Sequence, residues 1–262
     1  MKLHIVPAKQ GLAWVQQGIR TFWRQPLAFT GLFFLFMAWV SVLSMIPIIG
    51  AAVALVILPA ATLGLMVATE QAASGKFPMP TVLMIAFRAG QQRLKAMLTL
   101  GLLYAGSFLA VMLISALVDG GGFAKVYLAN APITPEVVSA SDFQAAMWLA
   151  TVLYIPLSMM FWHAPALVHW HGVPPVKSMF FSAVACWRNL GAFAVYLLAW
   201  IGVFLVGATV ILTVSSALGG NDLTGAVLMP GALLMAAMFF TSVYFSVKDC
   251  FDLPSPGSET QA

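Results

Sequence analysis

Six apolar stretches divide this chain, and each is long enough to cross a lipid bilayer as a helix. They cover residues 27–49, 51–70, 97–118, 147–167, 192–218 and 224–247. A bilayer core about 30 Å thick requires roughly 20 apolar residues per helix. Charged residues make up only 8% of the sequence, whereas they make up about a quarter of an ordinary soluble domain. The sequence therefore predicts an all-α membrane protein with six transmembrane helices.

Lysine and arginine are distributed unevenly over the connections between these stretches. Eleven of the twelve fall on one side of the topology that six crossings imply. Only Lys125 lies on the opposite side, together with Asp119, Glu136, Asp142 and Asp222. Basic residues close to membrane helices tend to stay in the cytoplasm. We therefore expect both termini to be cytoplasmic.

The chain divides into three parts. A cytoplasmic N-terminal segment, residues 1–26, precedes a six-helix transmembrane domain, residues 27–247, and a cytoplasmic tail, residues 248–262. Because the tail is rich in Pro, Ser and Gly, we expect it to be disordered. A cleaved signal peptide is not expected, since the first apolar stretch is too long and follows a polar, amphipathic segment. Cys186 and Cys250 fall on the cytoplasmic side, where thiols stay reduced.

A short amphipathic stretch precedes the first, third and fifth apolar stretches. In the first, the apolar face holds Leu12, Val15, Ile19, Phe22 and Trp23, and the polar face holds Gln16, Gln17, Arg20 and Arg24. The stretch that ends at Trp187 and Arg188 is similar, and the one that ends near Arg88 is looser. We predict interfacial helices on the inner leaflet, and three copies of a unit made of one such helix and a transmembrane hairpin. Chance similarity at the starts of membrane helices is the alternative.

Seven cations in or beside these stretches are candidates for contacts with anionic lipid headgroups: Arg20, Arg24, Arg88, Arg93, Lys95, Lys177 and Arg188. A basic residue near an anionic leaflet contributes about 1 kcal/mol to membrane binding. The alternative, which we prefer, is that these residues only fix the orientation. No nucleic acid partner is expected, because the cations are spread over several loops instead of clustering on one face of a soluble domain.

Small residues and prolines mark places where the helices pack or bend. Four small residues recur at four-residue intervals in the second stretch: Ala60, Gly64, Ala68 and Ala72. They form a smooth face for another helix or for a second copy of the chain. Pro59, Pro156 and Pro230 lie inside the second, fourth and sixth stretches, where each is expected to kink its helix. Kinked helices can frame a cavity, but packing geometry is the explanation that we prefer.

The apolar stretches contain almost no ionisable residues, which argues against an ion-driven pump. Glu70 and His163 are the exceptions, and both lie toward cytoplasmic ends. His163, His169 and His171 are close in sequence, but Pro165 interrupts the helix between them, so we interpret them as part of an aromatic belt instead of a zinc site. Because no nucleophile elbow, metalloprotease motif or phosphate loop occurs, we predict neither a cofactor nor an enzymatic activity.

Two runs of residues carry a resemblance to known families. They are Ala164-Pro165-Ala166-Leu167-Val168 with Gly172, Pro174, Pro175, Ser182 and Arg188-Asn189, and the earlier Pro59, Gly64, Gly75, Pro78, Pro80 and Phe87-Arg88. On these positions, within roughly residues 59–193, the chain resembles uncharacterised bacterial inner-membrane families. It is more distantly similar to the membrane domain attached to some glycerophosphoryl diester phosphodiesterases. The resemblance implies an inner-membrane fold, but these runs include no catalytic residues.

Two hypotheses for the function follow. The first, which we prefer, is a non-enzymatic multi-pass inner-membrane protein that acts through contacts with membrane lipids, a protein partner or a second copy of itself. The second is a permease or lipid-handling transporter with a largely apolar path. The first predicts a filled centre, and the second predicts a cavity that reaches the bilayer midplane beside Pro59, Pro156 or Pro230. A membrane enzyme would need Glu70, the histidines and the loop acids to converge.

Overall fold

The computed structural model describes residues 2–46, 49–129, 131–218 and 221–253. Six helical segments in these ranges are long and apolar enough to span a membrane: Pro26–Ser44, Gly50–Ala73, Gln91–Asp119, Ser141–His171, Leu190–Ala217 and Val227–Cys250. They correspond to α2 (Pro26–Ser44), α3 (Gly50–Ala73), α5 (Gln91–Asp119), α8 (Ser141–Trp162) with α9 (Ala164–His171), α11 (Leu190–Leu218) and α12 (Asn221–Cys250). The prediction of an all-α membrane protein with six membrane helices is confirmed.

Several helices are longer than the apolar stretches that predicted them. α5 begins at Gln91 instead of residue 97, and α12 continues to Cys250, so that the first residues of the predicted tail are helical. A helix can continue past the hydrocarbon because its backbone hydrogen bonds are internal. Residues 254–262 of the predicted tail lie outside the described residues.

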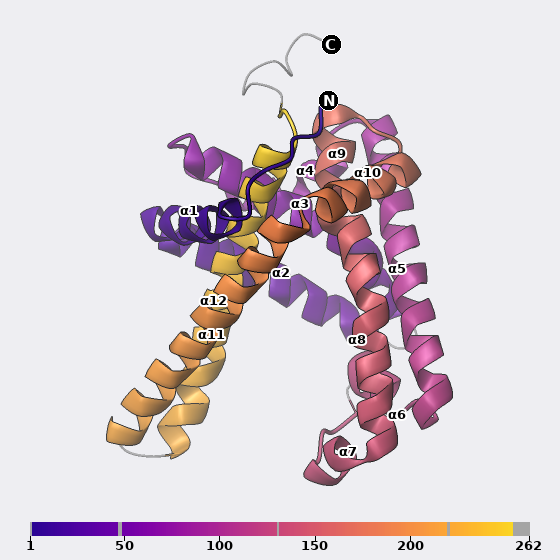
Figure 1. Cartoon of the computed structure of the whole chain (residues 1–262), viewed down its shortest axis with the longest axis vertical. Coiled ribbons are helices and arrows are strands. Elements are labelled where there is room, and N and C mark those ends of the chain that lie inside the picture. The colour runs from indigo at the N-terminus through magenta and orange to yellow at the C-terminus, as the bar shows by residue number, and fades with distance from the viewer. Residues whose placement is uncertain (1, 47–48, 130, 219–220, 254–262) are drawn as a thin grey trace.

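α3 is the central membrane helix. It has the largest buried share of the six spans and packs against α2, α5 and α12. α5 pairs with α8, and α11 pairs with α12; the two pairs diverge toward the bottom of Figure 1. The short helices α6 (Gly122–Ala129) and α7 (Pro135–Ser139) lie at that end of the α5–α8 pair. α3 therefore joins two helix pairs that separate away from it.

In the connection between α5 and α8, side chains accept hydrogen bonds from backbone amides at the starts of α6 and α7. Asp119 accepts hydrogen bonds from the amides of Gly121 and Phe123 at 2.9 and 2.6 Å. Thr134 accepts one from the amide of Val137, as expected of an N-cap residue, and its hydroxyl holds the pKa of the Glu136 carboxyl below the ordinary value. The connection is thus built from capped helices.

The small residues of α3 form a closely packed face, as predicted. Ala60, Gly64, Ala68 and Ala72 are all buried. A side chain at Gly64 would overlap the backbone of Leu83, which belongs to the 3₁₀ turn η1 (Pro80–Met84). A side chain at Gly101 of α5 would overlap the carbonyl of Val56 in α3. The close approach of neighbouring backbone in this region depends on residues without a side chain.

The helix before the first span, α1 (Gln10–Arg24), packs into the protein more deeply than an interfacial helix would. α1 packs against α11 and α12, and its Trp14 and Phe22 are buried, Trp14 beside Phe193 of α11. Side chains at Gly11 and Gly18 would overlap the backbones of Ala192 and Ser242. Leu12 and Trp23 are exposed although they belong to the predicted apolar face, because the glycines let a different face of α1 approach the membrane helices.

The two later amphipathic stretches differ from each other. The middle one is only η1 followed by the single turn α4 (Ile85–Arg88), whereas the third is the continuous helix α10 (Pro175–Arg188). α10 turns Ser178, Ser182, Ala185 and Cys186 inward and leaves Val176, Phe180 and Trp187 exposed. Helices therefore precede the first, third and fifth spans, but the threefold repeat stays a prediction.

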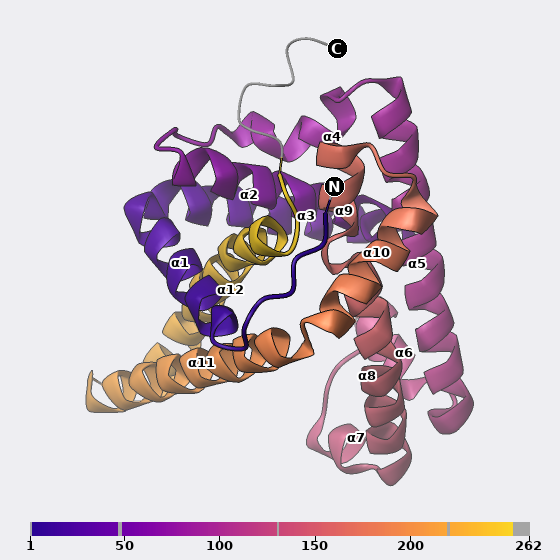
Figure 2. The same ribbon diagram turned by 45° about the horizontal axis from the view of Figure 1, so that its top comes forward.

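Both ends of the described chain lie on the same side of the molecule, as an even number of crossings requires (Figure 1). Leu3 and Phe251 form an isolated β-bridge, and the amide of His4 donates to the carbonyl of Cys250 at 2.9 Å. The Nε2 atom of His4 lies 2.7 Å from the Asp252 carboxylate, and this hydrogen bond lowers the pKa of Asp252. The N-terminal segment runs between α12 and α10 before it enters α1 (Figure 2).

Candidate functional site

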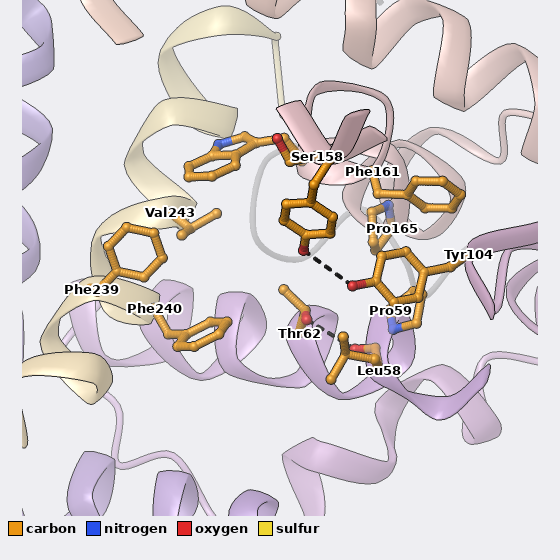
Figure 3. A pocket seen from close by; sticks show the side chains of 12 residues that line it. Leu58, Pro59, Thr62, Tyr104, Ser158, Phe161, Pro165, Phe239, Phe240 and Val243 are labelled. Atoms are coloured by element: carbon orange, nitrogen blue, oxygen red, sulfur yellow. Dashed lines mark hydrogen bonds between the residues drawn. The ribbon is translucent and has the colours of Figure 1, made fainter. Parts of the chain in front are cut away.

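A cavity of about 330 Å³ lies beside Pro59, between α3, α5, α8, α9 and α12 (Figure 3). Apolar side chains dominate its lining, among them Leu58 and Pro59 of α3, Phe161 and Trp162 of α8, and Phe239 and Phe240 of α12. Pro59 lies inside α3, one of the helices that are long and apolar enough to span a membrane. Ligand pockets usually measure about 300–1,000 Å³, and this cavity falls within that range.

The fourth span is interrupted at His163. α8 continues through Pro156 and ends at Trp162, and α9 begins at Ala164 with Pro165 in its first turn. Proline has no amide hydrogen to donate and its ring crowds the preceding turn. The sequence predicted an interruption at Pro165, which is confirmed, and a further kink at Pro156, where α8 continues as one helix.

The three prolines named from the sequence have different surroundings. Pro59 is buried and lines the cavity. Pro156 and Pro230 are exposed, and each lies inside a helix that continues past it. Only Pro59 of these three therefore contributes to the cavity, where it is joined by Pro165.

Ser182 of α10 bridges the interrupted turn. Its hydroxyl accepts a hydrogen bond from the amide of His163 at 2.9 Å and donates one to the carbonyl of Met159 at 2.7 Å. In a regular helix, that amide would donate directly to that carbonyl. Insertion of a side chain into this ladder is a recognised cause of helix bending. The bend places Phe161 and Pro165 on either side of the break, and both line the cavity.

Trp162 connects the two helix pairs across one wall of the cavity. Its indole Nε1 donates to the hydroxyl of Ser246 in α12 at 3.0 Å. Its ring meets Phe193, Tyr196 and Phe239 edge to face, at centroid distances of 5.7, 5.8 and 6.0 Å. Edge-to-face contacts at such distances are favourable, so this wall is an interlocked aromatic cluster.

Few polar groups face the cavity. The hydroxyl oxygens of Tyr104 and Tyr154 lie 3.2 Å apart. Thr62 and Ser158 donate their hydroxyls to carbonyls of their own helices, at 2.9 and 2.7 Å. Of the described side chains that line the cavity, none is charged. The tyrosine pair is therefore the lining group best able to orient a bound molecule.

A second cavity, of about 310 Å³, lies on the other side of Tyr154. Phe108 and Met112 of α5, Phe123 and Tyr127 of α6, and Ala150, Thr151 and Tyr154 of α8 line it. Tyr154 lines both cavities, which therefore adjoin at this residue.

His163 lies inside the protein and not at the water boundary. It is fully buried between the rings of Phe193 and Phe251, and its Nδ1 lies 3.7 Å from the sulfur of Cys186. His169 is 5% exposed. The prediction of an aromatic belt therefore does not fit these two histidines, which are buried inside the protein.

The region around His163 also contains the buried thiol of Cys186. Burial raises the pKa of the Cys186 thiol, which keeps the sulfur protonated and weakly nucleophilic. Within the described ranges, no group of three or more His, Cys, Asp or Glu side chains is arranged to hold a metal ion.

The cations predicted to contact headgroups are largely accessible. Arg93 is half-buried. The other six are exposed: Arg20, Arg24, Arg88, Lys95, Lys177 and Arg188. Trp23 and Trp187, the neighbours of Arg24 and Arg188, are 63% and 69% exposed. The ends of α1 and α10 thus each present an exposed tryptophan next to an exposed arginine.

Sequence reasoning missed the roles of Ser182 and of the tyrosine pair. Ser182 belongs to the run that carries the family resemblance, and Ser178, Ser182 and Cys186 recur at helical spacing, which could have indicated a packed polar face. Tyr104 and Tyr154 lie fifty residues apart on different helices, and a single sequence contains no signal for their contact.

A "probable inner membrane protein" of Burkholderia thailandensis is 41% identical to this chain over 261 residues, which cover 98% of this chain and 97% of that protein. No family model matches the chain, and no solved structure matches it. The name of this relative states a membrane location and no catalytic activity.

Proposed function

This chain belongs to the family of the Burkholderia thailandensis inner-membrane protein, and we propose that it binds a lipid-like molecule in the cavity beside Pro59. The single observation that carries the proposal is the cavity itself, which lies beside Pro59 of a candidate membrane-spanning helix and has an apolar, aromatic lining. The second hypothesis predicts a cavity beside one of the three prolines, and the cavity beside Pro59 supports it. The cavity supports a lipid-handling role for this multi-pass inner-membrane protein.

The proposed role is non-enzymatic. Acidic side chains that a hydrolytic site would use are engaged in structural hydrogen bonds. Asp119 caps α6, and Asp249 accepts hydrogen bonds from Gln10 and from the indole of Trp14 at 2.6 and 2.8 Å. His163 is enclosed by aromatic rings. These surroundings favour binding over catalysis.

Replacement of Thr62 by tryptophan tests the cavity. Thr62→Trp inserts a large ring into the space that a ligand would occupy. Thr209→Trp is the matched control, because Thr209 faces outward from α11 and its hydroxyl also donates to a carbonyl of its own helix. The protein is purified from native membranes in mild detergent, and the bound lipids are identified by mass spectrometry.

We expect the wild type and Thr209→Trp to retain a lipid species that Thr62→Trp loses. Equal unfolding temperatures of the two variants would show that the loss is local. The same retained lipids in all three proteins would contradict the proposal.

A second role, contact with anionic headgroups, is supported by the exposed pairs Trp23–Arg24 and Trp187–Arg188. Tryptophan is enriched at the boundary between membrane and water, and arginine forms strong bonds with phosphate oxygens. Both features would bring the ends of α1 and α10 to the inner leaflet. This role is compatible with a ligand in the cavity.

The cytoplasmic orientation of both termini is part of the proposal. Its support is the distribution of lysine and arginine, of which Lys125 alone falls on the other side. Reporter fusions at residue 125 and after residue 253 should report opposite compartments. Periplasmic activity of the second fusion would reverse the orientation.

We also propose that the distant similarity to the membrane domain of some glycerophosphoryl diester phosphodiesterases reflects a shared fold. The support is the order of the elements, in which a short helix precedes each of the first, third and fifth spans. An experimental structure of such a domain with a different helix order would contradict this relationship.

A further inference from the structure

We propose that the ligand of the cavity beside Pro59 is an uncharged amphiphile whose carbonyl oxygen is bound by the hydroxyls of Tyr104 and Tyr154. The inference rests on the proposed function and names the chemical class of the ligand. Ketones, quinones and esters with a long apolar chain belong to this class.

The tyrosine pair has a hydroxyl hydrogen left to donate. Each phenol has one O–H donor and two lone pairs, and the contact between them uses one donor and one lone pair. No other hydrogen bond links either hydroxyl to another residue in the described part of the chain. An unpaired donor away from water is costlier than an unused lone pair. A ligand that accepts a hydrogen bond would therefore fit this pair better than a hydrocarbon would.

The contact between the two hydroxyls is itself long. Their oxygens lie 3.2 Å apart (Figure 3, dashed line at Tyr104), whereas O–H···O bonds in proteins are commonly about 2.7–2.8 Å. A weak hydrogen bond is readily exchanged for one to a ligand oxygen, or shared with it. Tyr154 is 38% exposed and Tyr104 is 6% exposed, so Tyr154 is the side chain with room to turn toward the ligand.

Neighbouring rings hold the pair in place. The ring centroid of Tyr104 lies 5.1 Å from that of Phe161 and 6.2 Å from that of Phe108. The ring centroid of Tyr154 also lies 6.2 Å from that of Phe108. Tyr104 is thus fixed before a ligand binds, whereas Tyr154 keeps room to turn. Binding to a preorganised site avoids much of the entropy lost when side chains become ordered.

The absence of charge in the described lining excludes phosphate-bearing headgroups from the cavity. A charge near the bilayer centre costs several kcal/mol unless it is paired, and the lining supplies no cation. Exposed cations that could pair with phosphate are found elsewhere, for example at Arg24 and Arg188. The cavity therefore selects a neutral polar group, in contrast to the proposed headgroup contacts.

The second cavity provides room for the apolar part of the same molecule. It begins at Tyr154 and is lined by Phe108, Met112, Phe123 and other apolar side chains. A carbonyl held at the tyrosine pair would leave one apolar segment beside Pro59 and let another extend past Tyr154. The two cavities and the hydroxyls between them match a long chain with a polar group along its length.

Photolabelling with matched probes tests this inference. The probes are a long-chain ketone, the alkane of the same chain length, and phosphatidylglycerol, each with a diazirine in its chain. The full-length protein is labelled in nanodiscs, and mass spectrometry quantifies adducts at the cavity residues Leu58, Phe161 and Phe239. The variants are Tyr104→Phe and Tyr154→Phe, and Tyr127→Phe is the control because Tyr127 lines only the second cavity.

We expect the ketone to label these residues about threefold to tenfold more than the alkane, which is the ratio given by one hydrogen bond. Tyr104→Phe and Tyr154→Phe combined should abolish this preference, because either substitution alone leaves one hydroxyl that can still donate to the ketone, and Tyr127→Phe should retain it. Equal labelling by ketone and alkane, unchanged in the variants, would overturn the inference and leave the proposed function intact. Preferential labelling by phosphatidylglycerol would also overturn it. No labelling of the cavity by any probe would contradict the proposed function as well.

Discussion

The hydroxyl of Ser182 satisfies two backbone groups that the break at His163 leaves open. The amide of His163 and the carbonyl of Met159 both bond to it. Inside a membrane no water is available to these backbone groups. The interruption between α8 and α9 is therefore tolerated only because α10 supplies a hydrogen-bonding partner. Ser182 thereby links a helix outside the spans to the wall of the cavity.

Replacing Ser182 by alanine should destabilise the protein by about 1–3 kcal/mol, because two backbone groups lose their partner. Ser178→Ala is the matched control. Ser178 is also buried on α10, but its hydroxyl donates only to the carbonyl of Pro175 in its own helix. Thermal unfolding in nanodiscs measures both. Equal unfolding temperatures for the two variants would contradict the bridging role.

At the scale of elements, α1 shows how small residues decide which face of a helix is buried. Apolar periodicity predicts a face that includes Leu12 and Trp23. In the structure both are exposed, and Gly11 and Gly18 lie against α11 and α12. Close backbone approach is the main source of packing between helices in lipid. The glycines therefore outweigh the apolar pattern.

Gly18→Ala should loosen the contact between α1 and α12, since the added methyl group would overlap Ser242. Overpacking of this kind costs about 1–3 kcal/mol. Gly31→Ala is the control, because no atom lies within 4 Å of the position its methyl group would take. That substitution should be neutral or slightly stabilising, as alanine favours helix over glycine. Differential scanning fluorimetry compares the two, and an equal effect would refute the packing role of Gly18.

At the scale of the whole molecule, the structure separates two kinds of surface. The cavity is lined by apolar and uncharged groups of five helices, whereas the exposed Trp–Arg pairs lie at the ends of α1 and α10. A neutral ligand in the first and anionic headgroups at the second would not compete. The protein could therefore contact two classes of lipid at once.

Loss of both arginines should weaken the association with anionic lipid. For Arg24→Gln with Arg188→Gln we expect a loss of about 1 kcal/mol per cation, and the remaining association should fall with added salt. Native mass spectrometry of phosphatidylglycerol adducts measures the effect. Lys125→Gln on α6 is the control and should retain them. Unchanged adducts in the double variant at low salt would exclude the headgroup contact.

Some of the fold follows directly from local patterns. Apolar length predicted all six spans. The candidate site followed only in part. Pro59 was named as a residue beside a cavity and Pro165 as the interruption of the fourth span, but the hydroxyl that bridges this interruption was not foreseen. Proline alone does not reveal which freed backbone groups will find a partner on another helix.

The sequence by itself determined that the spans lie in hydrocarbon and that there are six of them. The transfer of an apolar segment into hydrocarbon depends on the length and composition of that segment and not on its neighbours in the fold. Only the tertiary structure decided which faces meet. The contacts of Ser182 with the broken turn, of Trp162 with α12 and of Tyr104 with Tyr154 join residues that are 19 to 84 positions apart. Such contacts depend on the relative placement of whole helices, which periodicity along one helix does not encode.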